Sequence, residues 1–158
     1  MSKFYPQIDE EVAQQGYTHR FDFNFQDIPA GIAVTIPQVF LLPKVIAGDE
    51  VIELGIRLIT PFTGGGNTTV TLDIGDQTSP TTFATAVTIG ATTPIVWQHL
   101  ADKNLVYTAA NQLQIRLTPT SLFTLSGLTA GQLWIDWNIF RSTDKPKNLP
   151  TPFGTGYT

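Results

Sequence analysis

Alternation of apolar and polar residues across residues 50–76 constrains the fold more than any other feature of the chain. In residues 52–58 and 70–74, every second side chain is a large aliphatic one. A period of two places those side chains on one face of a β-strand. Between the two runs, residues 61–67 include three consecutive glycines, which adopt the positive φ values that a chain reversal needs. We therefore predict a central β-hairpin, whose apolar face a second sheet or a closed barrel must cover.

The same period recurs along the chain. It is clearest in residues 18–26, where three phenylalanines alternate with polar residues. Further segments with this pattern are residues 28–38, 82–89, 113–118 and 131–140. Residues 39–45 are apolar but interrupted by Pro43, which predicts a connector rather than a full strand, and residues 95–105 fit either a short strand or a turn. About eight short strands, with joints rich in glycine, proline and threonine, predict an all-β fold, an antiparallel β-sandwich or jelly roll.

The chain divides into a body and two arms. Its 158 residues are enough for one domain with its own hydrophobic core. The period-two segments define a β-sandwich domain over residues 17–141. Residues 1–16 are irregular and predict an N-terminal arm. Residues 142–158 hold three prolines and two glycines, and they predict an extended C-terminal arm.

Composition argues against several classes of function. The chain has no cysteine, so neither a disulfide framework nor a thiolate site is available. Its formal net charge is −4 with 14% charged residues, and lysine and arginine do not cluster, so we expect no nucleic-acid partner. No apolar run reaches the roughly 18 residues of a membrane span, and no basic and apolar leader opens the chain. We expect a soluble protein without a conventional secretion signal and without membrane contact.

No group of residues matches a catalytic or metal-binding motif. His19 and His99 each lack a His, Asp or Glu at position i+2 or i+4, so both are expected to be structural. Asp73 and Asp76 are spaced as in the start of a calcium loop, but the further oxygen ligands are missing, and we predict that they cap a turn. Residues 64–66 are not followed by the Lys-Ser/Thr of a phosphate loop. We predict that the chain is not an enzyme and binds no cofactor or metal.

Aromatic side chains in unexpected positions mark candidate contact surfaces. Trp134 and Phe140 fall on the polar face of the final strand. Either a loop of the same chain covers them or they contact another subunit. The arms also carry large apolar side chains that have little to pack against internally, although the N-terminal arm could equally be a free tail. The predicted subunit or capsid contacts are Phe4, Tyr5, Trp134, Phe140, Leu149, Phe153 and Tyr157.

Four segments carry a resemblance to a known group of proteins. They are residues 31–37 (GIAVTIP), 47–52 (AGDEVI), 70–76 (VTLDIGD) and 130–137 (AGQLWIDW). In the order of these segments, residues 17–141 resemble the small β-sandwich virion proteins of tailed bacteriophages. The terminal arms resemble the reaching tails of head decoration proteins, which are also called cement proteins.

The resemblance implies a structural role. In head decoration proteins a jelly-roll body sits on the outer capsid shell, often as a trimer, and its arms lie across neighbouring major capsid subunits. This implies a cement protein of the virion, assembled in the host cytoplasm, whose partners are the major capsid protein and further copies of itself in a homotrimer. Two alternatives stay open. One is a tail, fibre or collar component that binds a host-surface glycan, with Trp134 or Trp97 as the stacking platform, and the other is a connector between virion parts.

Overall fold

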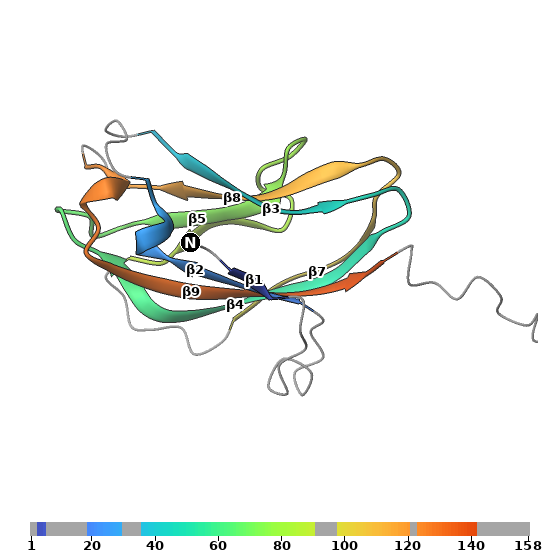
Figure 1. Cartoon of the computed structure of the whole chain (residues 1–158), viewed down its shortest axis with the longest axis horizontal. Helices are drawn as coiled ribbons and strands as arrows, with labels where there is room; N and C mark the ends of the chain where they lie inside the picture. Colours follow the sequence, from blue (N-terminus) through green and yellow to red (C-terminus); the bar gives the residue numbers. More distant parts are fainter. Residues whose placement is uncertain (1–2, 6–18, 30–35, 91–97, 121–122, 142–158) are drawn as a thin grey trace, which may run out of the picture.

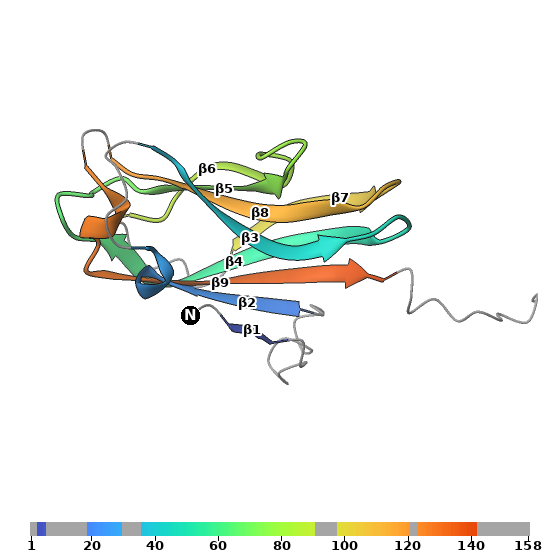
Figure 2. The ribbon, with the colours of Figure 1, turned by 45° about the horizontal axis from the view of Figure 1, so that its top comes forward.

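Two antiparallel β-sheets pack face to face in the computed structural model, which describes residues 3–5, 19–29, 36–90, 98–120 and 123–141 (Figure 1). The five-stranded sheet runs, edge to edge, through β1 (Lys3–Tyr5), β2 (His19–Asn24), β9 (Ala130–Phe140), β4 (Glu50–Thr63) and β7 (Gln98–Val106). The four-stranded sheet runs through β3 (Gln38–Val45), β8 (Asn111–Thr118), β5 (Thr71–Asp76) and β6 (Ala84–Thr88). Figure 2 shows the two layers from a second direction. The predicted all-β sandwich is confirmed.

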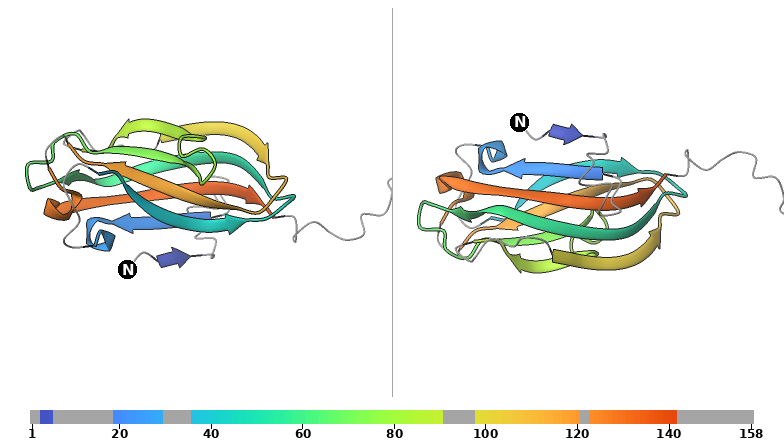
Figure 3. Two further views of the ribbon diagram at one scale, coloured as in Figure 1. Left: turned by 90° about the horizontal axis from the view of Figure 1, so that it is seen from above. Right: turned by 90° about the horizontal axis from the view of Figure 1, so that it is seen from below.

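The strands pair in nested order. β5 pairs with β6, β4 with β7, β3 with β8 and β2 with β9, always antiparallel. These pairs fall alternately in the two sheets. The pairing of β4 with β9 joins two of them into the five-stranded sheet, and the pairing of β5 with β8 joins the other two into the four-stranded sheet (Figure 3). One long antiparallel ribbon folded over on itself gives this arrangement, which is the topology of a jelly roll. Short 3₁₀ helices lie in the connections after β2 and before β9, at Phe25–Asp27 and Leu125–Gly127.

Every second residue of the central strands fills the core. On β9, Leu133, Ile135 and Trp137 are at most 1% exposed, and the residues between them face outwards. Phe23 of β2 contacts the opposite sheet, because its ring centroid lies 4.8 Å from that of Phe40 on β3. The period-two pattern of the sequence therefore gives the side chains that enter the core, as expected for antiparallel strands. Some polar residues of the outer faces, such as Asp136, are buried as well.

The predicted central hairpin is wrong. β4 and β5 lie in different sheets and do not pair with each other. The glycines that join them are packed closely against the connection between β8 and β9: a Cβ added to Gly65 would lie 2.7 Å from the carbonyl oxygen of Gly127. The turn therefore carries the chain across to the opposite sheet instead of reversing it within one.

The predicted phase of β4 holds from Leu54 onwards but not at the start of the strand. The register with β9 shifts between Val51 and Glu53. Because of this shift, Val51 and Leu54 both lie in the core, while Ile52 is only half-buried. A register shift of this kind arises when one strand of a pair carries an extra residue, a β-bulge, and it changes which side chains face inwards.

Residues 39–45, predicted as a connector, belong to the full strand β3. Pro43 is tolerated there because β3 is an edge strand and its register with β8 shifts between Leu41 and Lys44. In the segment predicted as a strand just before it, residues 30–35 lie outside the described part of the chain. Ile36, which the pattern placed in phase with the core, is 57% exposed. Of the ambiguous residues 95–105, residues 98–105 belong to β7, and residues 95–97 lie outside the described part of the chain.

Gly131 offers a test of the packing at the start of β9. Its φ is 152°, and an added Cβ would lie 2.4 Å from the Phe62 ring. Gly131→Ala should therefore lower the free energy of unfolding by about 2–4 kcal/mol, from backbone strain and overpacking, measured by urea denaturation. The comparison variant is Gly127→Ala, whose Cβ would lie 3.2 Å from Cα of Gly65 and which needs no positive φ, so its loss should be smaller than that of Gly131→Ala. Equal losses in the two variants would contradict this account.

Candidate interaction surfaces

A polar cluster lies on the outer face of the five-stranded sheet. In the register of β2 with β9, Arg20 stands opposite Asp136. In the register of β4 with β9, Arg57 stands opposite Trp134. Residues opposite each other in an antiparallel pair share a face of the sheet. Three adjacent strands thus bring two arginines, one aspartate and one tryptophan together.

Arg20 and Asp136 form a buried ion pair. Nε of Arg20 donates to Oδ1 of Asp136 at 2.7 Å, and Nη2 donates to Oδ2 at 3.2 Å. Asp136 is 0% and Arg20 8% exposed. On β4, the residue opposite Asp136 is Gly55, which has no side chain to compete for the space. Such a bidentate pair, with little access to water, stabilises the fold only while both partners are present.

The position of Trp134 on the polar face is explained by its neighbours. The guanidinium carbon of Arg20 lies 4.1 Å from the centroid of the Trp134 ring, and that of Arg57 lies 5.4 Å away. Both distances are within the range of a cation–π interaction. Trp134 is half-buried in this cluster. Arginines of the neighbouring strands thus contact the ring, an arrangement that the sequence did not suggest.

Three exposed apolar side chains lie at the end of the sandwich where β9 finishes. Phe140 is 43%, Val106 50% and Ile46 44% exposed. Glu50 stands opposite both Phe140 and Val106, so these three share the outer face of the sheet, and Ile46 lies on the turn that leads to Glu50. Figure 1 shows the β3–β4 turn, the β7–β8 turn and the tip of β9 at one end of the molecule. We call Ile46, Val106 and Phe140 the loop-end surface.

Hydrogen bonds around the buried Asp49 hold the loop-end surface in place. Oδ2 of Asp49, a fully buried residue, accepts the backbone N–H of Ile46 at 3.1 Å and Nη1 of Arg141 at 2.9 Å. The same Nη1 donates to the carbonyl oxygen of Lys44 at 2.9 Å. The backbone N–H of Tyr107 donates to the carbonyl oxygen of Asp49 at 2.8 Å. The two turns and the end of β9 are therefore one connected unit.

A depression of about 420 Å³ opens beside this unit, between the β5–β6 and β7–β8 connections. Asp76 organises it: Oδ1 accepts the backbone N–H groups of Thr78 and Ser79 at 2.8 and 2.9 Å. The predicted turn-capping role of Asp76 is confirmed. Oδ2 accepts the hydroxyl of Tyr107 at 2.9 Å. Burial, together with this hydrogen bond and the charge of Asp76, raises the pKa of Tyr107 well above its ordinary value.

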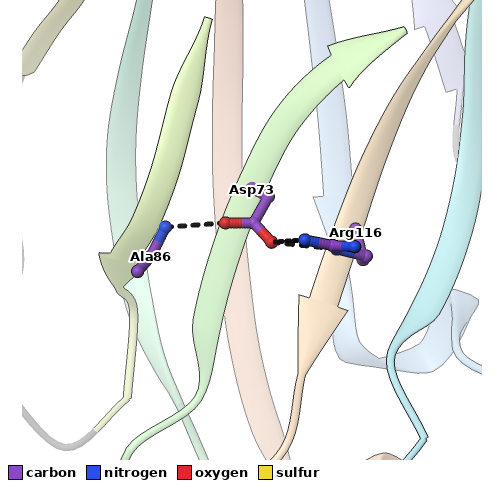
Figure 4. A network of polar contacts seen from close by, with 3 residues as sticks. All are labelled: Asp73, Ala86 and Arg116. Atoms are coloured by element: carbon purple, nitrogen blue, oxygen red, sulfur yellow. Dashed lines mark hydrogen bonds and ion pairs between the residues drawn. The ribbon is translucent and has the colours of Figure 1, made fainter. Parts of the chain in front are cut away.

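Asp73 does not cap a turn, so the prediction for this residue is wrong. It lies within β5 and joins three strands on the outer face of the four-stranded sheet (Figure 4). Oδ1 accepts the backbone N–H of Ala86 at 2.7 Å, and Oδ2 accepts Nε and Nη2 of Arg116 at 2.9 and 2.7 Å. Ala86 has a φ of 50°, an unfavourable value for alanine that the hydrogen bond from its N–H helps to offset. Both carboxylate oxygens are engaged by donors.

A second exposed apolar surface follows the edge of the four-stranded sheet. Ile36 is 57%, Val39 49% and Leu41 61% exposed. Val39 stands opposite Arg116, and Leu41 stands opposite Gln114. Their side chains therefore point away from the core. Among the strands that the structure describes, β8 alone pairs with β3. We call Ile36, Val39 and Leu41 the β3 edge.

The predicted contact residues fall in different places. Phe140 belongs to the loop-end surface and Trp134 to the polar cluster. Phe4 and Tyr5 lie in β1, which pairs with β2 at the edge of the five-stranded sheet, so this part of the predicted N-terminal arm is a strand of the body. Four residues lie outside the described part of the chain: Trp97, Leu149, Phe153 and Tyr157.

Sequence reasoning missed several residues of these surfaces. Arg20 and Arg57 occupy ordinary polar positions of alternating strands, and only the register of the strands reveals that both contact Trp134. Val106 directly follows residues 95–105, whose structure the sequence left ambiguous. Its neighbour Leu105 is half-buried and packs against the core. Because neighbouring residues of a strand face opposite sides, this placement was the signal that could have predicted an outward-facing Val106.

Within the described ranges, no three His, Asp or Glu side chains come together as metal ligands would. None of the helices in the same ranges is long and apolar enough to cross a membrane.

The buried ion pair can be tested by removing one charge. Asp136→Asn removes the carboxylate charge that faces the buried guanidinium of Arg20, so the free energy of unfolding should fall by about 3–5 kcal/mol. Urea denaturation measures it. The matched control is Asp22→Asn on the same outer face. There the carboxylate accepts a hydrogen bond from Nε2 of Gln132 at 3.3 Å in a partly buried position, and the loss should be below about 1 kcal/mol. Comparable losses in the two variants would show that the ion pair of Arg20 and Asp136 does not contribute more to the free energy of unfolding than an ordinary contact of the outer face.

Tyr107 gives the fold a dependence on alkaline pH. Its pKa is raised in the folded state, whereas an unfolded tyrosine ionises near pH 10. The unfolded chain thus releases a proton that the folded chain keeps, and the free energy of unfolding should fall as the pH rises above about 10. Tyr107→Phe removes this proton and should show a smaller decline between about pH 8 and pH 11. Parallel declines in the variant and the wild type would contradict the assignment.

Comparisons of the chain with protein-family models, with curated proteins and with solved structures found no match.

Proposed function

We propose that this chain is a structural virion protein of a tailed phage, a capsid decoration or cement protein that binds the outer shell and bridges neighbouring capsid subunits. The loop-end surface is the observation that supports the proposal most. It presents three exposed apolar side chains, Ile46, Val106 and Phe140. By contrast, the aspartates at positions 49, 73 and 136 already form ion pairs with arginines of the same chain. Jelly rolls are also a common fold of viral capsid proteins, which adds support by analogy.

The loop-end surface is suited to a stable contact with a partner, because it is apolar and its backbone is already held in place. Burying Ile46, Val106 and Phe140 on a partner would contribute roughly 1.5–3 kcal/mol for each side chain, before ordering costs. Those costs are small here, because Asp49 and Arg141 already fix the turns beneath the surface. On a shell, several contacts made at once strengthen one another, since each later contact is intramolecular. The proposed partners are the major capsid protein and two further copies in a homotrimer.

Glycan binding by a tail or fibre component is the weaker candidate. A sugar ring stacks on an open aromatic face. The ring of Trp134 already contacts the guanidinium groups of Arg20 and Arg57, and Tyr107 beside the depression is only 6% exposed. Neither side chain offers a free platform. A connector between virion parts would use the same loop-end surface and would differ from a decoration protein in copy number.

Copy number separates these roles. The test is to purify particles of the phage that carries this chain and to measure its amount relative to the major capsid protein by quantitative mass spectrometry. A decoration protein should be present in hundreds of copies per particle and on the head. A ratio that corresponds to tens of copies, or location on the tail, would reject the proposal in favour of a fibre or connector role.

Occupancy on the head should depend on the loop-end surface. The double variant Val106→Ser, Phe140→Ser should bind heads that lack the protein at least about tenfold more weakly than the wild type, because it removes two apolar contacts. The control is Phe123→Ser, which replaces a side chain of similar exposure, 39%, in the connection between β8 and β9. Circular dichroism confirms that each variant is folded. Equal binding by the double variant and the control would exclude the loop-end surface as the contact.

A further inference from the structure

In residues 149–157, both the size of the side chain and the residue's backbone type alternate with a period of two. The odd positions all hold residues with a side chain and an N–H group. They are Leu149, Thr151, Phe153, Thr155 and Tyr157. The even positions hold proline or glycine. They are Pro150, Pro152, Gly154 and Gly156.

In an extended strand this pattern makes the two edges unequal. The N–H and C=O groups of one residue point to one edge, and those of the next residue point to the other. The edge formed by the odd positions therefore keeps every donor, while two prolines remove donors from the opposite edge. Such a strand can pair on one side, and it blocks the addition of a further strand on the other side.

The β3 edge is suited to receive such a strand. Val39 and Leu41 are exposed on the outward face of β3, and the described strands leave its far edge without a partner. An unpaired edge with exposed apolar side chains invites pairing with another strand. Cross-strand contacts would cover Val39 and Leu41 with the apolar side chains of the odd positions, which all lie on one face.

The chain leaves the body close to the C-terminal end of β3. Nη1 of Arg141 donates to the carbonyl oxygen of Lys44, near the end of β3. Residues 142–148 span at most about 25 Å when extended, and residues 145–148, Lys-Pro-Lys-Asn, place proline where a type I turn favours it. A turn there directs residues 149–157 back along β3 in the antiparallel sense.

We infer that residues 149–157 add as an antiparallel strand to the free edge of β3 in the same chain. The short tether sets a high effective concentration, which favours the chain's own edge over that of a second copy. The added strand covers the β3 edge and ends the sheet with prolines. Leu149, Phe153 and Tyr157 would then pack against the body of their own chain, in place of the subunit contact predicted from the sequence. The inference does not depend on the proposed virion role.

Two adjacent proline substitutions in the full-length chain test the inference. Thr155→Pro removes an N–H that the added strand gives to β3, whereas Gly156→Pro removes one on the opposite edge. The measurement is hydrogen–deuterium exchange at the backbone amides of residues 38–41 that point away from β8. Thr155→Pro should speed their exchange by about tenfold or more, as in a chain truncated after Asn148, and Gly156→Pro should change it by less than about twofold.

Each other outcome overturns the inference. Equal exchange in the truncated and full-length chains would mean that residues 149–157 do not cover the β3 edge. Equal effects of the two prolines would mean that they cover it without one-sided strand pairing. Protection that grows with protein concentration would place the strand on a second copy and reject the same-chain assignment.

Discussion

The close approach of the β4–β5 turn to the β8–β9 connection is the constraint on which the rest of the fold depends. Asn67 holds the two together: its Nδ2 donates to the carbonyl oxygen of Thr124 at 2.7 Å, and its Oδ1 accepts the N–H of Thr120 at 3.2 Å. Glycine at position 65 permits the contact, because any side chain there would meet Gly127. Since β4 and β5 then enter opposite sheets, each later strand pairs with an earlier one in nested order. The jelly roll follows from that one crossing.

Much of the strand content could be predicted from the sequence, because burial of one face imposes a period of two on β2, β8, β9 and most of β4. Strand partners could not be predicted in the same way. The glycines at 64–66 suit a reversal within a sheet as well as a crossing between sheets, and only the contact with Gly127 decides between them. Pro43 suggested a break for a similar reason: its effect depends on whether the strand lies at an edge.

The candidate surfaces were harder to predict than the fold. Phase along one strand places Trp134 and Phe140 on the outer face, but it does not give their neighbours. Trp134 contacts Arg20, more than one hundred positions earlier in the chain, whereas Phe140 stays 43% exposed at the end of the same strand. The two aromatics looked equivalent in the sequence and differ only because of the register of β2 and β4 with β9. Long-range pairing of this kind leaves no local signal.

The central place of β9 has a mechanical consequence. The strand pairs along its length with β2 on one side, over six residue pairs, and with β4 on the other, over ten. Arg141, just beyond its end, is tied to Asp49 and Lys44. Tension applied to the chain after Arg141 acts along the axis of β9, so both hydrogen-bonded ladders are loaded in shear and share the force instead of opening one bond at a time. The strand that leads out of the body is thus the one best placed to bear a pull.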